Sequence, residues 1–188
     1  MQARRKAWPK TVEEIPVRSL VFLDESAAST SMTRLYGRGP VGERVVDSAP
    51  LGGWRTYTML SALRWDGPFA PLLLEGALDG DAFEAWTEQF LIPELRRGDV
   101  VVMDNLPTHR IAAVSRLLEK KGHGLLFLPP YSPDLNPIEE MWSKVKSFLR
   151  DAKARTWDQL LEAMAGALRT IAKKDCVGYF SDCGYVIN

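Results

Sequence analysis

The distribution of apolar and polar positions along the chain predicts a set of short strands. Continuous apolar runs of four to eight residues are typical of buried strands, particularly where turn-forming residues follow them. The sequence Asp66-Gly67-Pro68 separates two such runs and predicts a hairpin turn between them. The predicted strands cover residues 20–23, 57–63, 69–74, 99–104 and 125–128.

Other segments carry the spacing of helices, with apolar residues recurring every three or four positions. From about Asp81, the residues Phe83, Trp86 and Phe90 recur at this spacing and should face inward, and Pro93 and Gly98 should end the helix. Residues 29–53 are rich in Gly and Pro and predict irregular structure, with one short strand over residues 44–47. Three more helices are expected over residues 108–121, 137–152 and 157–173.

This order of elements predicts an α/β fold. A hairpin followed by alternating strands and helices is typical of a mixed sheet that helices cover on both faces. The length of 188 residues suits one domain with a short appendage. We expect residues 1–18 to be a basic arm in which Pro9 and Pro16 break regular structure, and residues 19–188 to be the domain.

Composition excludes several classes of protein. No apolar run approaches the roughly 20 residues of a membrane span, and no apolar stretch follows the basic N-terminus as in a secretory signal. Cys176 and Cys183, separated by six residues and without a nearby histidine, fit neither a zinc site nor a disulfide scaffold. We therefore expect a protein of the reducing cytoplasm, without membrane contact.

Charge is balanced overall but unevenly distributed. Lys and Arg number 24 and Asp and Glu number 24, so no global basic surface for nucleic acid is expected. Residues 1–18 carry five basic and two acidic side chains, and residues 141–156 carry five basic and one acidic side chain. Such runs are usually solvated surface, and they gain a functional meaning only beside a site.

Two aspartates follow strongly apolar runs. Asp24 follows Leu-Val-Phe-Leu and Asp104 follows Val-Val-Val-Met, so each is predicted at the end of a strand. In sheets with parallel strands, ligand sites gather at the carboxyl ends of the strands. Two carboxylates on neighbouring strands repel each other unless a cation such as Mg²⁺ lies between them. The alternative is that each aspartate is an ordinary turn or cap residue.

A third acid, Glu139, stands at the start of the helix predicted after a Pro-rich loop. Asn136 suits the N-cap, Pro137 the first helical position, and Glu139 the third, which would complete a capping box. Glu139 therefore has a structural explanation as well as a functional one.

The angular positions on this helix separate Glu139 from Glu140. At about 100° per residue, Glu139 falls at the edge of the apolar stripe and Glu140 points to solvent. Lys146, Arg150 and Lys153 fall on the same flank as Glu139, forming a basic track suited to a phosphate backbone. The apolar stripe comprises Ile138, Met141, Trp142, Val145, Leu149 and Ala152.

The residues around these acids resemble the mariner-like superfamily of transposases, in its bacterial insertion-sequence branch, the six-thirty group. The resemblance rests on Leu23-Asp24-Glu25, on Met103-Asp104-Asn105 followed by His109, and on the block Leu-Pro-Pro-Tyr-Ser-Pro-Asp-Leu-Asn-Pro-Ile-Glu ending at Glu139. Thirty-four residues, 105 to 138, separate Asp104 from Glu139, which is the spacing of that family. The similarity extends from about Arg18 to the C-terminus.

The resemblance implies a ribonuclease-H-like core with Asp24, Asp104 and Glu139 as catalytic acids holding two Mg²⁺ or Mn²⁺ ions. It implies metal-dependent cleavage and strand transfer of DNA, with a TA target and a homodimer in the active complex. Asn105 and His109 match the motif after the second acid and would have a supporting or DNA-contacting role. The two-ion arrangement is a clamp on phosphoryl transfer that requires no covalent enzyme intermediate.

One departure from the family is the missing helix-turn-helix region that reads the ends of the element. We expect either a separate helix-turn-helix polypeptide from an upstream reading frame or a truncated relic. Three alternatives remain open: a nuclease or resolvase with the same core, a degenerate or domesticated DNA- or partner-binding protein, and a glycosidase, which also uses paired carboxylates. A sugar cleft would need exposed aromatics, whereas Trp86 and Trp142 lie on apolar helix faces.

Overall fold

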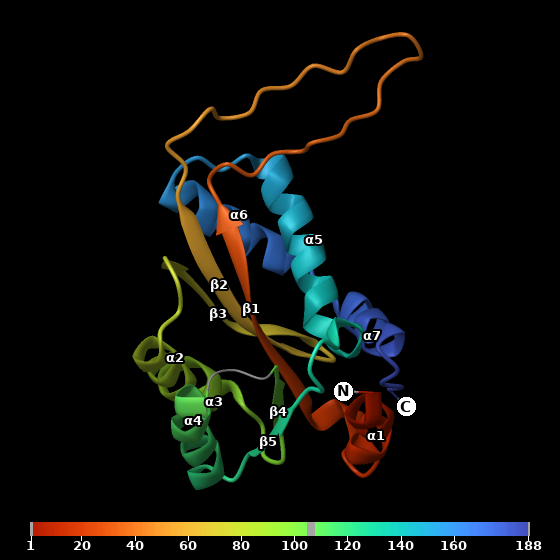
Figure 1. Ribbon diagram of the computed structural model, residues 1–188, viewed down its shortest axis with the longest axis vertical. Coiled ribbons are helices and arrows are strands. Elements are labelled where there is room, and N and C mark those ends of the chain that lie inside the picture. The colour runs from red at the N-terminus through yellow and green to blue at the C-terminus, as the bar shows by residue number, and fades with distance from the viewer. Residues whose placement is uncertain (1, 105–107, 188) are drawn as a thin grey trace.

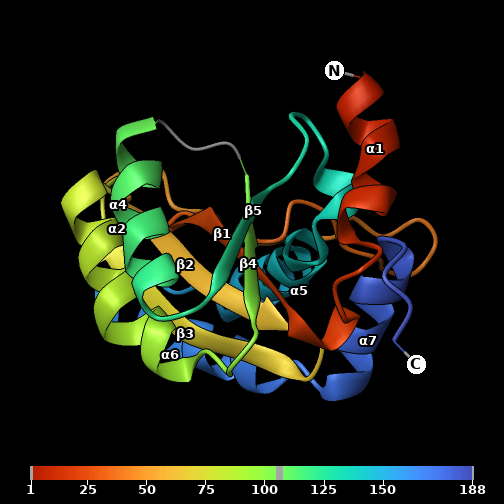
Figure 2. The same cartoon turned by 90° about the horizontal axis from the view of Figure 1, so that it is seen from below.

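The protein is built around one mixed five-stranded sheet, described here from a computed structural model of residues 2–104 and 108–187. The strand order is β3-β2-β1-β4-β5 (Figures 1 and 2). β1 pairs antiparallel with β2 and parallel with β4, so the hairpin half and the parallel half of the sheet meet at β1. The strands are β1 (Leu20–Ser29), β2 (Thr56–Arg64), β3 (Gly67–Glu75), β4 (Val100–Met103) and β5 (Gly124–Phe127).

Helices cover both faces of the sheet, which confirms the predicted α/β class. On one face lie α1 and the last three helices, and on the other lie α2, α3 and α4 (Figure 2). Among the described residues, no helix is both long and apolar enough to cross a bilayer. The helices are α1 (Gln2–Val12), α2 (Gly80–Trp86), α3 (Ile92–Glu94), α4 (Thr108–Lys120), α5 (Pro137–Ala152), α6 (Trp157–Arg169) and α7 (Lys173–Asp182).

Successive residues of β1 supply the two cores alternately. Leu20 and Phe22 pack with the helices of the C-terminal half, and Val21 and Leu23 pack with α2 and α4. This follows from the two-residue period of a strand, whose neighbouring side chains point to opposite faces. A strand buried on both faces must be apolar at every position, which explains the continuous run that begins β1. Trp86 and Trp142 are buried, as expected for core tryptophans.

The N-terminal segment differs from the prediction. We expected an arm without regular structure over residues 1–18, but residues 2–12 form α1, with Pro9 inside the helix. Pro9 has no N–H to give to the carbonyl four residues earlier, which normally disfavours this position. Trp8 is only 4% exposed and belongs to the larger core cluster. Tertiary packing of this indole therefore outweighs the local cost of the proline.

Three further elements differ from the prediction, two in their boundaries and one in its burial. β1 continues to Ser29, so Asp24 lies inside the strand and not at its end, because β2 pairs with it along this whole length. The predicted last helix over residues 157–173 ends earlier, as α6 at Arg169, and a further helix that we did not predict, α7, begins at Lys173. β5 is the edge strand of the sheet, and its residues are only half-buried although we predicted a buried strand.

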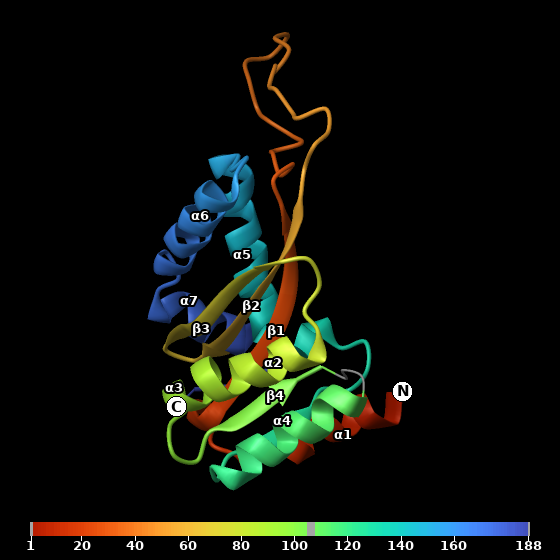
Figure 3. The ribbon, with the colours of Figure 1, turned by 90° about the vertical axis from the view of Figure 1, so that its left-hand side faces the viewer.

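Two local predictions, for Phe90 and for residues 44–47, were wrong. Phe90 is 49% exposed, because a π-helical turn over Thr87–Leu91 inserts an extra residue and brings Leu91 into the inward position. The segment between β1 and β2 contains no strand over residues 44–47. It is a long irregular loop that projects beyond the ends of α5 and α6 (Figures 1 and 3).

Candidate active site

Asp24 and Asp104 belong to the two parallel strands at the centre of the sheet. β1 and β4 pair in register, with Phe22 opposite Val102. Continuing this register by two residues brings Asp24 beside Asp104, on the edge where β4 ends and β1 continues. The sheet thus brings together two acids that are 80 positions apart in the chain, because strand pairing fixes which residues are neighbours.

The loop between β5 and α5 brings Glu139 to the same place. Together with the two aspartates it surrounds a pocket of about 420 Å³. The Glu139 side chain is exposed, so its carboxylate is accessible from solvent. The pocket is lined by Asp24, Asp104, Leu128, Pro129, Pro130, Tyr131, Ser132, Pro133, Asn136 and Glu139.

The three acids interact electrostatically. Burial raises the pKa of Asp24 to about 8, and the negative charges of Glu139 and then Asp104 add to this effect. Burial also raises the pKa of Asp104. Both shifts mean that burial disfavours the charged form of these carboxyls, and at Asp24 the neighbouring negative charges disfavour it further. A bound cation or a cationic group would relieve that cost.

The acids share the pocket but do not stand as a preformed metal site. Among the described residues, no three His, Cys, Asp or Glu side chains already form a compact set of ligands. Carboxylates that repel each other are expected to stay apart until a cation offsets their charge. Asp24 lies within electrostatic range of both other acids.

The predicted capping box at the start of α5 is absent. Asn136 precedes the helix in extended conformation, but its side chain accepts no bond from the first turn. The Glu139 N–H donates to the backbone carbonyl of Asn136, at 3.0 Å. The Glu139 carboxylate is therefore not engaged in a cap and faces the pocket instead. Asn136 Oδ1 is itself buried without a hydrogen-bond partner on the pocket wall.

The two neighbouring glutamates lie in different environments. We predicted that Glu140 points to solvent, but it is half-buried, and burial together with the charge of Asp182 raises its pKa. The reason is α7, an element we did not predict, which packs against α5. The predicted apolar stripe of α5 is buried except for Ala152, which is exposed at the last turn.

The basic residues predicted to contact DNA are only partly free. Lys146 is half-buried and Arg150 is exposed on α5. Lys153 ends α5 in a left-handed conformation and forms an ion pair with Asp47 of the long loop. Asn105 and the side chain of His109 lie outside the described residues. The structure adds Ser132 and Asn136, two buried polar residues of the pocket wall that our site prediction omitted.

Comparison with known proteins agrees with this geometry. The sequence profile described as "DDE superfamily endonuclease" matches residues 19–161. The chain belongs to this family. The DDE endonuclease domain thus includes the whole sheet and all three acids of the pocket.

Curated relatives are transposases of nematodes. Over 100 residues the chain is 31% identical to the Tcb1 transposase of Caenorhabditis briggsae, covering 51% of this chain and 37% of that protein. Over 89 residues it is 30% identical to the Tc1 transposase of Caenorhabditis elegans, covering 47% of this chain and 33% of that protein. The resemblance to mariner-like transposases is confirmed, and the matched segment corresponds to about a third of each relative.

Solved structures show the same fold. A pre-cleavage Mos1 transpososome superimposes with a TM-score of 0.72 at 13% identity, covering 97% of this chain and 57% of that chain. The catalytic domain of Mos1 mariner transposase gives a TM-score of 0.62 at 12% identity, covering 97% of this chain and 83% of that chain. The expected ribonuclease-H-like architecture is therefore confirmed.

Proposed function

We propose that this DDE endonuclease domain cleaves DNA strands and transfers them, as the catalytic part of a transposase. The observation that carries the proposal is the pocket lined by Asp24, Asp104 and Glu139, in which burial and then the charges of the other two acids raise the pKa of Asp24. A site for phosphodiester chemistry needs charge that can hold divalent cations beside an open space for the backbone. The pocket offers both.

The donor set fits Mg²⁺ or Mn²⁺. All three side chains offer oxygen ligands, which hard divalent cations prefer, and the described residues that line the pocket include no histidine or cysteine. Mos1 paired-end complexes have been solved with Mn and with Mg. We propose two ions held by Asp24, Asp104 and Glu139. Such ions, when bound, make a hydroxyl nucleophilic and offset charge on the leaving oxygen.

The side chains of the pocket have distinct tasks in this proposal. Asp24, the most buried of the three acids, would be one of the ligands of the ions. Asp104 and Glu139 face it from the sheet and from α5, so the scissile phosphate would lie in the space between the sheet edge and the helix. A water, or later a DNA 3′-hydroxyl, attacks phosphorus in line with the bond that breaks. No side chain becomes covalently attached.

The test of the proposed function is nicking of supercoiled plasmid by the purified chain with Mg²⁺ or Mn²⁺. Strand cleavage that requires the divalent ion, followed by joining of a supplied 3′-hydroxyl end to the plasmid, is the expected result. Cleavage without joining would favour the related nuclease or resolvase. DNA binding without cleavage would favour the degenerate or domesticated protein.

Binding of the divalent ion should stabilise the fold. Mn²⁺ offsets the repulsion among three carboxylates, so it should raise the melting temperature of the wild-type domain by several degrees. At a pH above the raised pKa of Asp24, where this carboxyl is charged, Asp24→Asn should melt higher than wild type without metal, because one repelling charge is gone, and it should lose most of the Mn²⁺-dependent rise. Differential scanning calorimetry with and without Mn²⁺ measures both effects. An equal rise in the two proteins would place the ion elsewhere.

We further propose that Lys146 and Arg150 contact DNA phosphates, with Lys153, Asn105 and His109 as additional contacts. Replacing Lys146 and Arg150 by Ala should weaken DNA binding, and the slope of log affinity against log salt should fall by about 2. Fluorescence anisotropy at several salt concentrations measures this slope. Lys120→Ala with Lys121→Ala, at the exposed end of α4, is the charge-matched control and should leave the slope unchanged. If the two double variants had the same slope of log affinity against log salt, Lys146 and Arg150 of α5 would not be DNA contacts.

Partners beyond DNA are also part of the proposal. We propose a homodimer in the active complex, supported by the long loop between β1 and β2, which exposes several large apolar side chains to solvent. We also propose a separate helix-turn-helix polypeptide as the partner that reads the element ends. The exposed apolar residues of the loop are Leu35, Tyr36, Val41, Val45, Val46, Leu51 and Trp54.

A further inference from the structure

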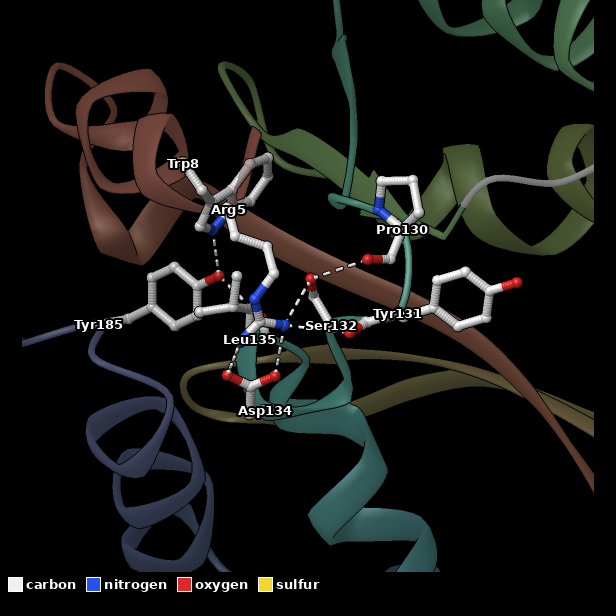
Figure 4. Close-up of polar contacts among 8 residues, drawn as sticks. All are labelled: Arg5, Trp8, Pro130, Tyr131, Ser132, Asp134, Leu135 and Tyr185. Atoms are coloured by element: carbon white, nitrogen blue, oxygen red, sulfur yellow. Dashed lines mark hydrogen bonds and ion pairs between the residues drawn. The ribbon is translucent and has the colours of Figure 1, made fainter. Parts of the chain in front are cut away.

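One arginine of α1 binds the loop that carries the pocket wall. Arg5 Nη1 donates to the backbone carbonyl of Tyr131 at 3.0 Å and to Ser132 Oγ at 2.8 Å. The same guanidinium donates to both carboxylate oxygens of Asp134, from Nη1 to Oδ1 at 2.9 Å and from Nη2 to Oδ2 at 2.7 Å (Figure 4). A planar guanidinium is suited to this bidentate contact, whereas a lysine would provide only a point charge.

A second pair of contacts ties the same loop to the other end of the chain. Trp8 Nε1 donates to the hydroxyl of Tyr185 at 2.8 Å, and that hydroxyl donates to the carbonyl of Leu135 at 2.8 Å (Figure 4). Trp8 and Tyr185 are both buried. The Tyr185 ring also packs on Phe22, with ring centroids 5.1 Å apart, two positions before Asp24 on β1.

The loop needs such support because its backbone is strained. Tyr131 has a φ of +55°, a left-handed conformation that is costly for a bulky side chain and persists only when the surroundings hold it. Ser132 follows it, buried, and its hydroxyl accepts from Arg5. Five residues after Asp134, the chain reaches Glu139. Whatever holds Tyr131 to Leu135 in place therefore sets where α5 begins and where Glu139 faces.

We propose that Arg5, Trp8 and Tyr185 are positioning residues that clamp the loop of residues 130–136 and thereby aim Glu139 at Asp24. This inference rests on the proposed function for its effect on catalysis. The clamp gives a role to the contact between α1 and the loop of the pocket wall, which lies more than 100 positions later in the chain. The lowered pKa of Asp134, caused by its bonds to Arg5, keeps this carboxylate charged for the contact.

The first test is hydrogen–deuterium exchange of the full chain. It measures how firmly the loop of residues 130–136 is held and does not depend on enzymatic activity. The amides of Leu135 and Asn136 donate within the turn to Ser132 and Pro133. In Arg5→Ala these amides should exchange at least about tenfold faster, while those of β1 and β4 should be unchanged. Arg4→Ala, an exposed arginine of the same helix, is the matched control and should match wild type. Unchanged exchange in Arg5→Ala would overturn the clamp.

The second test is plasmid cleavage kinetics with Mn²⁺. Arg5→Ala and Asp134→Asn should each lower kcat about ten- to a hundredfold with little change in KM, because a misplaced acid affects chemistry more than binding. If Arg5 instead bound DNA, Asp134→Asn would free it and lower KM, which would contradict the proposal. Tyr185→Phe removes one hydroxyl and keeps the ring, so the protein should stay folded. Its kcat should fall, but by less than that of Arg5→Ala or Asp134→Asn.

These two tests separate the clamp from the proposed function. An inactive wild type would contradict the proposed function, and the exchange experiment would still decide the clamp. Faster exchange in Arg5→Ala with wild-type kcat would show that the loop is held by α1 but that its position does not matter for Glu139. That outcome would overturn the positioning role.

Discussion

Glu139→Gln is expected to reduce metal-dependent DNA cleavage by at least about a thousandfold, while the domain remains folded. The substitution keeps the shape of the side chain and removes the negative charge that we propose holds a cation at the α5 side of the pocket. A thousandfold loss corresponds to about 4 kcal/mol of transition-state stabilisation, which is typical for losing one electrostatic group of a preorganised site. Single-turnover nicking of plasmid with Mn²⁺ measures it.

The matched control for this prediction is Glu140→Gln, one position along the same helix. Glu140 is half-buried near Asp182 and is absent from the pocket lining, so removing its charge should leave cleavage near wild type. Asp24→Asn and Asp104→Asn should behave like Glu139→Gln. If Glu140→Gln were inactive and Glu139→Gln active, our assignment of the third acid would be wrong.

The fold could largely be predicted from the sequence because its strands are short, apolar and well separated by turn residues. A buried strand must be apolar at every position, and this holds for the start of β1 and for β4. The position of Glu139 at the flank of α5 could also be predicted, because the angle between residues of one helix depends only on their separation. Its orientation toward the pocket follows from that angle once the apolar stripe faces the sheet.

The elements that could not be predicted are those fixed by contacts between distant parts of the chain. α1 contains a proline and few apolar residues, and its Trp8 is buried by Tyr185, 177 positions away. The extension of β1 past Asp24 depends on pairing with β2, which a local pattern of alternating burial does not reveal. The capping box failed for the opposite reason, since the motif was present but the Asn136 side chain faces the pocket wall.

Removing one partner of the buried ion pair between Arg64 and Asp99 is expected to have the largest effect on stability. Arg64 Nη2 donates to Asp99 Oδ2 at 2.7 Å, and the two side chains are only 5% and 3% exposed. Asp99 also accepts from the backbone N–H of Arg96 at 2.9 Å, directly before β4 begins. Arg64→Ala leaves an unpaired charge in the interior, so the free energy of unfolding should fall by about 3–5 kcal/mol. Urea denaturation measures this difference.

The control is the exposed pair between Arg55, directly before β2, and Glu75, the last residue of β3. These side chains are 67% and 61% exposed, so Arg55→Ala should cost less than about 1 kcal/mol. In the double variant Arg64→Met with Asp99→Asn, no charge is left unpaired, and most of the lost stability should return. Equal losses in Arg64→Ala and Arg55→Ala would mean that burial does not set the cost. The pair between Arg64 and Asp99 lies directly before β4, the strand that leads to Asp104. Arg64→Ala should therefore also lower the temperature at which cleavage is lost.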